Sequence, residues 1–135
     1  MTKTWTGGCA CGALRYEISA DPIAMVDCQC RDCQLESGTG HASHIVFARE
    51  GAKTTGDAAQ YEMRADSGNM KTRHFCKTCG CPVLMTFAAT PDVFTVRAAS
   101  LDEPDRYQPQ IVTYTARGHD WDHLDPALPK FERMP

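Results

Sequence analysis

The stretches Cys9-Ala10-Cys11-Gly12 and Cys76-Lys77-Thr78-Cys79-Gly80 decide how this chain folds. Each places two cysteines one or two positions apart and follows them with a glycine, so a short turn directs both sulfurs towards one point. Glycine permits the positive φ angle that lets the backbone turn around a sulfur. Four sulfurs at about 2.3 Å from a tetrahedral ion form the usual structural zinc site. Two such turns facing each other would therefore hold one zinc ion and join distant parts of the chain.

A third cluster, Cys28-Gln29-Cys30-Arg31-Asp32-Cys33, lies between them. If the two pairs form a closed site, this triplet is left over, and three thiolates leave an open coordination position where chemistry can occur. The alternative is a second structural zinc with a fourth protein ligand. The candidates for that ligand are Cys81, His41, His44 and His74. Residues three apart on a strand point to opposite faces, so at most one of His41 and His44 is expected to face the ion.

The chain has 135 residues, of which 42% are hydrophobic, and we expect a single globular domain over 1–135. A net charge of −3 without a basic tail argues against nucleic acid and anionic membranes as partners. The sequence contains neither a signal-peptide core nor an apolar stretch of about 18 residues, so we expect a cytoplasmic protein. In a reducing compartment, eight cysteines indicate metal ligands or redox groups, whereas disulfides would require a secreted protein.

The segments between the clusters alternate polar and apolar residues or are rich in β-branched residues, which is typical of strands. We expect strands at 14–18, 24–28, 41–48, 61–64, 72–75, 83–87, 93–98 and 110–115. The one expected helix is short, covers 31–37 and ends at Gly38. Residues 120–135 include three prolines and are expected to form an extended surface segment. Many short strands separated by turns indicate an all-β domain of small antiparallel sheets.

Together these motifs resemble the family of glutathione-dependent formaldehyde-activating enzymes, also called the GFA or centromere-protein-V domain. The resemblance covers nearly the whole chain. The ordered set of three cysteine motifs is specific, whereas Cys-x-x-Cys-Gly alone occurs in many zinc ribbons. The matching segments are Gly7-Gly8-Cys9-Ala10-Cys11-Gly12 with Arg15-Tyr16, Cys28-x-Cys30-x-x-Cys33 with Ser37-Gly38, Phe75-Cys76-x-x-Cys79-Gly80, Ser100-Leu101-Asp102, Trp121 and Leu128-Pro129-x-Phe131.

The resemblance implies an Mss4-like fold, two zinc ions, and glutathione as co-substrate. It implies a carbon–sulfur lyase that joins a small-molecule thiol, glutathione, to formaldehyde as S-hydroxymethylglutathione. The implied ligands of the structural zinc are Cys9, Cys11, Cys76 and Cys79. The implied ligands of the second, catalytic zinc are Cys28, Cys30 and Cys33. The alternative function is a non-catalytic zinc-binding module that carries or senses a thiol or binds a protein partner, and a fourth protein ligand at the middle cluster would favour it.

Arginine side chains can bind the carboxylates of glutathione through two hydrogen bonds. The candidates are Arg31, Arg49, Arg64 and Arg73, and Arg31 is preferred because it lies inside the ligand loop. We expect Cys81 to be a small buried hydrophobic residue and Trp121 to lie in the core. The sequence assigns no role to four neighbouring residues, namely His119, Asp120, Asp122 and His123.

Overall fold

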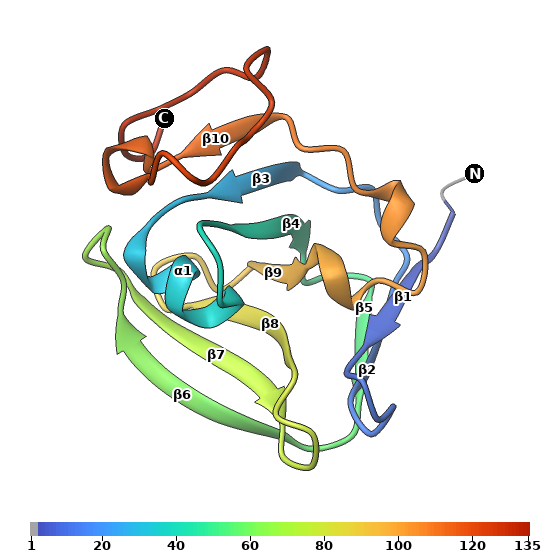
Figure 1. Ribbon diagram of the computed structural model, residues 1–135. Coiled ribbons are helices and arrows are strands. Elements are labelled where there is room, and N and C mark those ends of the chain that lie inside the picture. The colour runs from blue at the N-terminus through green and yellow to red at the C-terminus, as the bar shows by residue number, and fades with distance from the viewer. Residues whose placement is uncertain (1–2) are drawn as a thin grey trace.

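The computed structural model describes residues 3–135, which form two β-sheets, one α-helix and three short 3-10 helices (Figure 1). The strands are β1 Trp5–Gly8, β2 Arg15–Ile18, β3 Ala24–Cys28, β4 Ala42–Ala48, β5 Ala52–Thr55, β6 Ala58–Arg64, β7 Met70–Cys76, β8 Pro82–Phe87, β9 Val93–Arg97 and β10 Ile111–Thr113. The helices are α1 Arg31–Ser37, η1 Ala98–Ser100, η2 Pro104–Arg106 and η3 Thr115–Arg117.

The smaller sheet has the strand order β1-β2-β5, and the larger has the order β10-β3-β4-β9-β8-β7-β6. All neighbouring strands are antiparallel except β10 and β3, which are parallel. The architecture is the expected mainly-β, Mss4-like fold. In Figure 1 the small sheet stands at one end of the larger sheet, and α1 lies beside β4 and β8.

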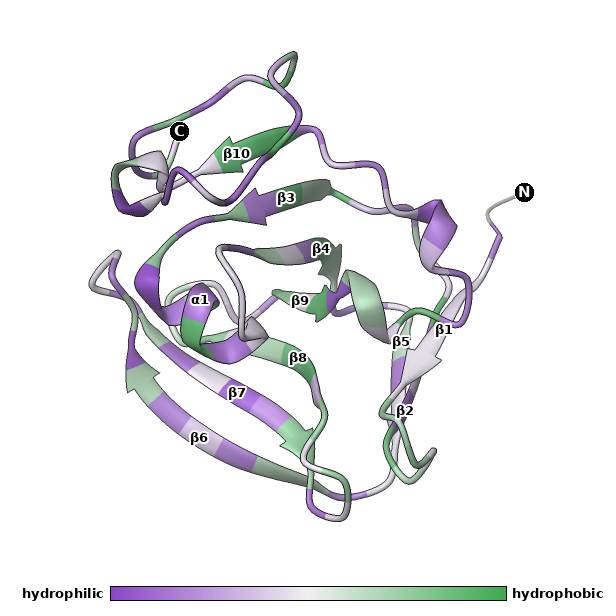
Figure 2. Ribbon diagram, in the orientation of Figure 1, coloured by the Kyte–Doolittle hydropathy of each residue, from purple (hydrophilic) through white to green (hydrophobic). Residues whose placement is uncertain are grey.

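The main core lies where the two sheets meet. Trp5 of β1 packs edge-on against Phe47 of β4 with ring centroids 5.7 Å apart, and Phe47 also contacts Phe94 of β9. Figure 2 shows hydrophobic residues on β8 and β10 and many hydrophilic residues on β6 and β7. The hydrophilic strands therefore form the more solvated edge of the large sheet, and burial concentrates on its central strands.

The predicted helix is confirmed with the predicted bounds, because both of its ends carry strong signals. Gly38 follows it in the left-handed conformation (φ 80°) and donates its N–H to Gln34 O at 2.9 Å, which closes the helix. At the other end Cys30 is the N-cap residue, and its sulfur accepts a hydrogen bond from the Cys33 N–H at 3.3 Å. The helix start therefore depends on a cysteine of the middle cluster.

Three features differ from the sequence prediction. Strands β1 and β5 were not expected, since the two glycines of β1 and the lysine and threonines of β5 give no alternating apolar pattern. Strand β10 pairs in parallel with β3, which sequence patterns alone do not specify. Trp121 was expected in the core, and this was wrong: it is 61% exposed and stacks on the His119 ring.

The segment after residue 120 lies alongside β10, as its extended character predicted. Phe131 donates its N–H to Val112 O at 2.9 Å, and Val112 donates to Pro129 O at 3.0 Å. No helix in residues 3–135 has the length and hydropathy needed to cross a membrane.

Gly56 connects β5 of the small sheet to β6 of the large sheet and has φ 92°. A Cβ atom there would lie 1.9 Å from Ala13 O, whereas one at Gly68, with φ 91°, would meet nothing within 4 Å. We predict that Gly68→Ala lowers the free energy of unfolding by about 1–2 kcal/mol, the cost of the left-handed conformation. Gly56→Ala should cost about 1–3 kcal/mol more, because it also overpacks the junction. Urea denaturation would measure both; equal losses would contradict the prediction.

Candidate functional site

The first and third cysteine motifs meet in the fold. The β1–β2 connection carries Cys9 and Cys11, while Cys76 ends β7 and Cys79 lies in the β7–β8 connection. Their four sulfurs all lie within 4.8 Å of one another, with 3.7 Å between Cys9 and Cys11 and 3.6 Å between Cys11 and Cys76. Tetrahedral zinc with bonds of about 2.3 Å requires sulfurs about 3.8 Å apart. These four residues therefore fit a closed zinc site.

Backbone amides in both turns point at the sulfurs. The Leu14 N–H donates to Cys9 Sγ at 3.3 Å, and the Thr78 N–H donates to Cys76 Sγ at 3.3 Å. The hydrogen bond from Leu14 lowers the pKa of Cys9 to about 6. Backbone N–H groups likewise lower the pKa of Cys79. These backbone amides therefore favour the thiolate form of Cys9 and Cys79, which a metal ion requires. At Cys11 a backbone amide acts in the same direction, but the neighbouring Cys76 and Cys9 raise its pKa to about 11.

The middle cluster forms where β3 leads into α1. Cys28 ends β3 and is half-buried, while Cys30 and Cys33 at the start of α1 are buried. Their sulfurs also lie within 4.8 Å of one another. Hydrogen bonds from the thiols of Cys30 and Cys33 lower the pKa of Cys28 to about 3, whereas its proximity raises the pKa of Cys33. The cluster thus holds one thiolate readily and resists further negative charge unless a cation is present.

None of the four residues considered as a fourth ligand has a ligand atom close to all three sulfurs. His44 comes nearest, with Nε2 at 3.3 Å from Cys33 Sγ, but in residues 3–135 the set of mutually close ligand atoms contains only the three cysteines. His41 instead pairs with Asp122, and His74 Nε2 lies 3.0 Å from Thr86 Oγ1. Cys81 is half-buried against the core and donates to Pro82 O. His41 precedes β4 and pairs with Asp122, whereas His44 lies on β4 and is the one of the two that contacts a cysteine of the cluster.

His44 supports the cluster without completing it. Its ring is buried, and burial lowers its pKa to about 3, so the imidazole is neutral at physiological pH. A neutral ring can donate one hydrogen bond to the Cys33 thiolate and so fix that sulfur's position. Tyr114 adds a cover over Cys30 and Cys33, and it is the one non-glycine among the described residues with a positive φ angle, 58°.

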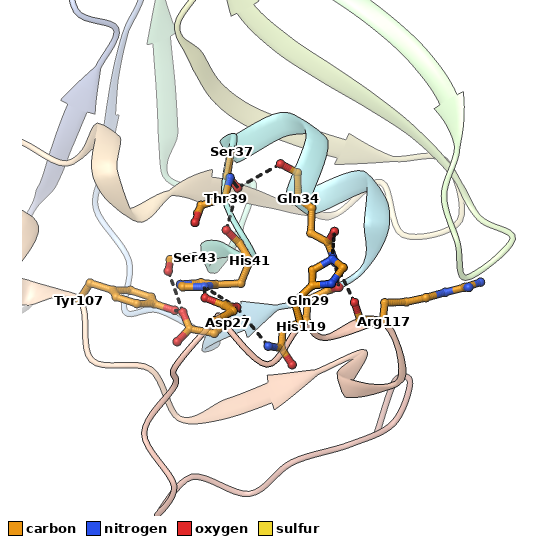
Figure 3. Close-up of polar contacts among 11 residues, drawn as sticks. Asp27, Gln29, Gln34, Ser37, Thr39, His41, Ser43, Tyr107, Arg117 and His119 are labelled. Carbon is orange, nitrogen blue, oxygen red and sulfur yellow. Dashed lines mark hydrogen bonds and ion pairs between the residues drawn. The ribbon is translucent and has the colours of Figure 1, made fainter.

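The segment after β10 is bound to α1 through Gln34, which is buried. Its amide nitrogen donates to Gln29 O and to Arg117 O, both at 2.9 Å. His119 Nε2 donates to Gln34 Oε1 at 2.9 Å (Figure 3). The opposite side of the cluster is reached by the β6–β7 turn, where Asp66 pairs with Arg117. The helix, this turn and the C-terminal segment together enclose the three cysteines.

Asp122 is a site residue that the sequence did not reveal. Its carboxylate is only 7% exposed and accepts hydrogen bonds from His41 Nδ1 at 2.9 Å and Gln29 Nε2 at 3.1 Å. Near His41, Asp27 accepts bonds from the hydroxyls of Ser43 and Tyr107, both at 2.7 Å (Figure 3). No local motif marks these residues, since each pair forms only when distant segments meet.

Two clefts adjoin the region between the cysteine clusters. The larger has a volume of about 780 Å³ and is lined by Cys9, His41, Ser43 and Cys81 among others. The smaller has a volume of about 230 Å³ and lies between α1 and strands β7 and β8. Both are lined by Glu36, Pro82 and Arg97, so they meet at these three residues.

Glu36 forms a buried ion-pair cluster beneath α1. Its carboxylate is 2% exposed and lies 3.2 Å from Lys71 Nζ, 3.6 Å from Arg73 Nε and 3.0 Å from Arg97 Nη2. Glu36 therefore attaches α1, and with it the middle cysteines, to strands β7 and β9. Arg73 was a sequence candidate for carboxylate binding, whereas Arg97 and Lys71 were not considered.

The other candidate arginines have separate positions. Arg31 is exposed on α1 and donates to Gln34 Oε1 at 3.1 Å. Arg49 and Arg64 are exposed and donate to the carbonyl oxygens of Pro91 and Gly68. Of the four candidates, Arg73 is the one that lines either cleft.

The protein is a small β domain with two cysteine clusters, each of which could hold a metal ion. A family model described as "Glutathione-dependent formaldehyde-activating enzyme" matches residues 4–117, and the chain belongs to this family. A crystal structure of a protein from Rhodobacter sphaeroides matches with a TM-score of 0.58 and 15% sequence identity, over 93% of this chain and 98% of that chain. At this identity the likeness supports the fold alone.

We predict that Glu36→Gln lowers the free energy of unfolding by about 3–5 kcal/mol, because it leaves three cations without their shared carboxylate in a buried site. The matched control is Glu103→Gln, which removes an exposed carboxylate that pairs with Lys3 at 2.8 Å. Exposed pairs contribute little, so this control should unfold almost like the wild type. Chemical denaturation of the three proteins would test this, and a small loss in Glu36→Gln would show that the cluster is dispensable.

Proposed function

We propose that this protein is a zinc-dependent carbon–sulfur lyase of the glutathione-dependent formaldehyde-activating type. The middle cluster carries the proposal: Cys28, Cys30 and Cys33 converge, while the described residues provide no fourth protein ligand. A closed four-ligand site would be structural, whereas three ligands leave a position for a substrate. Family membership supports glutathione as the thiol and formaldehyde as the aldehyde.

The first cluster has a different proposed role. Cys9, Cys11, Cys76 and Cys79 would hold a zinc ion with no free position, so this ion would stabilise the fold and take no part in the reaction. It would join the β1–β2 connection to the β7–β8 connection and so fix the small sheet against the large one. The walls of the larger cleft would then keep their positions relative to α1.

A zinc ion at the middle cluster would supply a Lewis acid that lowers the pKa of a thiol. The chain's own residues supply position. His44 holds the Cys33 sulfur, Gln34 fixes the segment that covers the cluster, and Tyr114 excludes water from the buried side. In the proposed reaction the sulfur of glutathione forms one bond to the formaldehyde carbon. The thiol proton is transferred to the carbonyl oxygen, which gives S-hydroxymethylglutathione.

The proposed partner is therefore a small-molecule thiol, and the proposed location is the cytoplasm. All eight cysteines are free in the structure, which suits a reducing compartment in which thiolates remain available to a metal. Arg31 remains a proposed contact for a glutathione carboxylate at the rim of the site.

We predict that Cys79→Ser abolishes binding of the structural zinc and removes most of the domain's stability, because metal-binding free energy becomes folding free energy. Cys79 is exposed, so the substitution disturbs little packing and reports on the metal. Cys81→Ser is the matched control, since Cys81 lies two positions later outside the cluster. Zinc content by mass spectrometry and thermal melting should separate the two variants. Wild-type melting and full zinc content in Cys79→Ser would refute the structural assignment.

We predict that the zinc at the middle cluster leaves first when a chelator is added, and that glutathione slows this loss by occupying the fourth position. Cys30→Ser should remove this protected zinc while the fold persists. Serine is a good N-cap residue, so the start of α1 keeps its hydrogen bond.

Zinc release can be followed with a metal-sensitive dye. Two phases are expected in the wild type, of which glutathione slows only the faster. If both zinc ions leave at one rate and glutathione changes neither, the enzyme proposal fails and the non-catalytic module takes its place.

A further inference from the structure

The ion-pair cluster beneath α1 carries more positive charge than its surroundings balance. Lys71, Arg73 and Arg97 face one carboxylate, so three positive charges minus one negative charge leave a net charge of +2. Within residues 3–135, Glu36 supplies the one carboxylate within 4.0 Å of these cations. The side chains of Lys71 and Arg97 are only 4% and 8% exposed. Excess charge with so little solvation favours a bound anion.

Several buried polar atoms at this place also have no hydrogen-bond partner among the described residues. They include Arg97 Nη2 and Arg73 Nε, whose contacts with Glu36 have the distance of ion pairs without hydrogen-bond geometry. Thr95 Oγ1 is unpartnered as well. His44 is the cross-strand neighbour of Arg97, and Thr95 precedes Arg97 by two positions on β9. Glu36 Oε1 is unpartnered too, so the one carboxylate that faces the two arginines does not satisfy their hydrogen-bonding capacity.

The cluster lies close to the middle cysteines and opens into the clefts. Glu36 follows Cys33 by three positions on α1, which places both on one face of the helix with about 5–6 Å between their Cβ atoms. His44 contacts Cys33 and pairs across the sheet with Arg97. Arg97 lines both clefts and Arg73 lines the smaller one. A ligand in the clefts can therefore reach the two arginines. Cys28, Cys30 and Cys33 line neither cleft, and Cys33 neighbours the arginine site through Glu36 on α1 and His44 on β4.

We propose that Arg97 and Arg73 form a carboxylate-binding site that selects anionic thiols and directs their sulfur to the middle cluster. This inference rests on the proposed function. Arginine binds carboxylates with two parallel hydrogen bonds. Glu36 faces one nitrogen of each guanidinium group without hydrogen-bond geometry, and Arg73 Nη2 donates to Met63 Sδ at 3.2 Å. In glutathione one residue follows the cysteine, and an extended residue spans about 3.3–3.6 Å, so that carboxylate lies within about 7 Å of the sulfur. One turn of an α-helix rises about 5.4 Å, so Cys33 and Glu36 on α1 are separated by a distance similar to that between the sulfur and this carboxylate of glutathione.

Isothermal titration calorimetry of the zinc-loaded protein tests the proposal. The ligands are glutathione and its diethyl ester, which keeps the thiol and the peptide but carries no carboxylate. The wild type should bind glutathione about ten-fold or more tightly than the ester, as expected for charge-assisted hydrogen bonds to arginine. Arg97→Gln and Arg73→Gln should reduce this preference to near unity by weakening glutathione binding alone.

Arg64→Gln is the matched control, because Arg64 is exposed and lines neither cleft; it should keep the full preference. Arg97 is buried and its replacement can impair folding, but Arg73 is 29% exposed and its variant keeps the test decisive. Equal binding of glutathione and ester by the wild type, or an undiminished preference in Arg73→Gln, would overturn the carboxylate site and leave the proposed function intact. If the wild type binds neither ligand, the proposed function itself fails.

Discussion

The convergence of four sulfurs from two hairpin connections is the constraint on which the rest of the structure depends. Cys9 and Cys11 lie in the connection between two strands of the small sheet. Cys76 ends β7 of the large sheet, Cys79 lies in the connection that follows it, and the four sulfurs lie within 4.8 Å of one another. Four thiols alone would contribute little binding free energy, and four thiolates would repel. A cation turns the same arrangement into a strong cross-link between segments far apart in sequence. Such a cross-link is valuable in a domain whose strands are mostly short.

The middle cluster depends on a different kind of support. Its three cysteines lie on a β3–α1 corner, and α1 has only seven residues, too few to be stable alone. Two buried contacts hold the helix in place: Glu36 pairs with cations of the large sheet, and Gln34 binds the C-terminal segment. Because Cys33 lies on the same short helix as these anchors, residues that do not contact its sulfur help His44 to position it. The geometry of the site is therefore a property of the tertiary fold.

The contrast between local cysteine spacing and contacts made by the tertiary fold explains which features can be predicted from the sequence. The cysteine clusters, the helix with its closing Gly38 and most strands follow from spacing and periodicity within a few residues, and these predictions agree with the structure. The Arg97–Glu36 and Asp122–His41 contacts join residues more than 60 positions apart, so no local pattern marks them. Exposed Trp121 was misplaced for a similar reason: a large aromatic residue is usually buried, and whether a surface segment can cover it depends on the path of the whole tail.

Thiol addition to formaldehyde proceeds readily without a catalyst. Its activation free energy is therefore already low, and a protein can lower it only a little further. What the fold can add is the choice of thiol and its orientation. A cell contains many thiols, and a metal ion alone discriminates poorly among them. If the proposed carboxylate site is correct, a buried site with two excess positive charges next to the cysteine corner would discriminate by charge, since a neutral thiol would leave that excess unbalanced. Holding the sulfur at a fixed place also replaces a random encounter in solution with a reaction between oriented groups. Under the proposed function, selectivity and position, more than acceleration of bond formation, would be the physical contributions of this architecture.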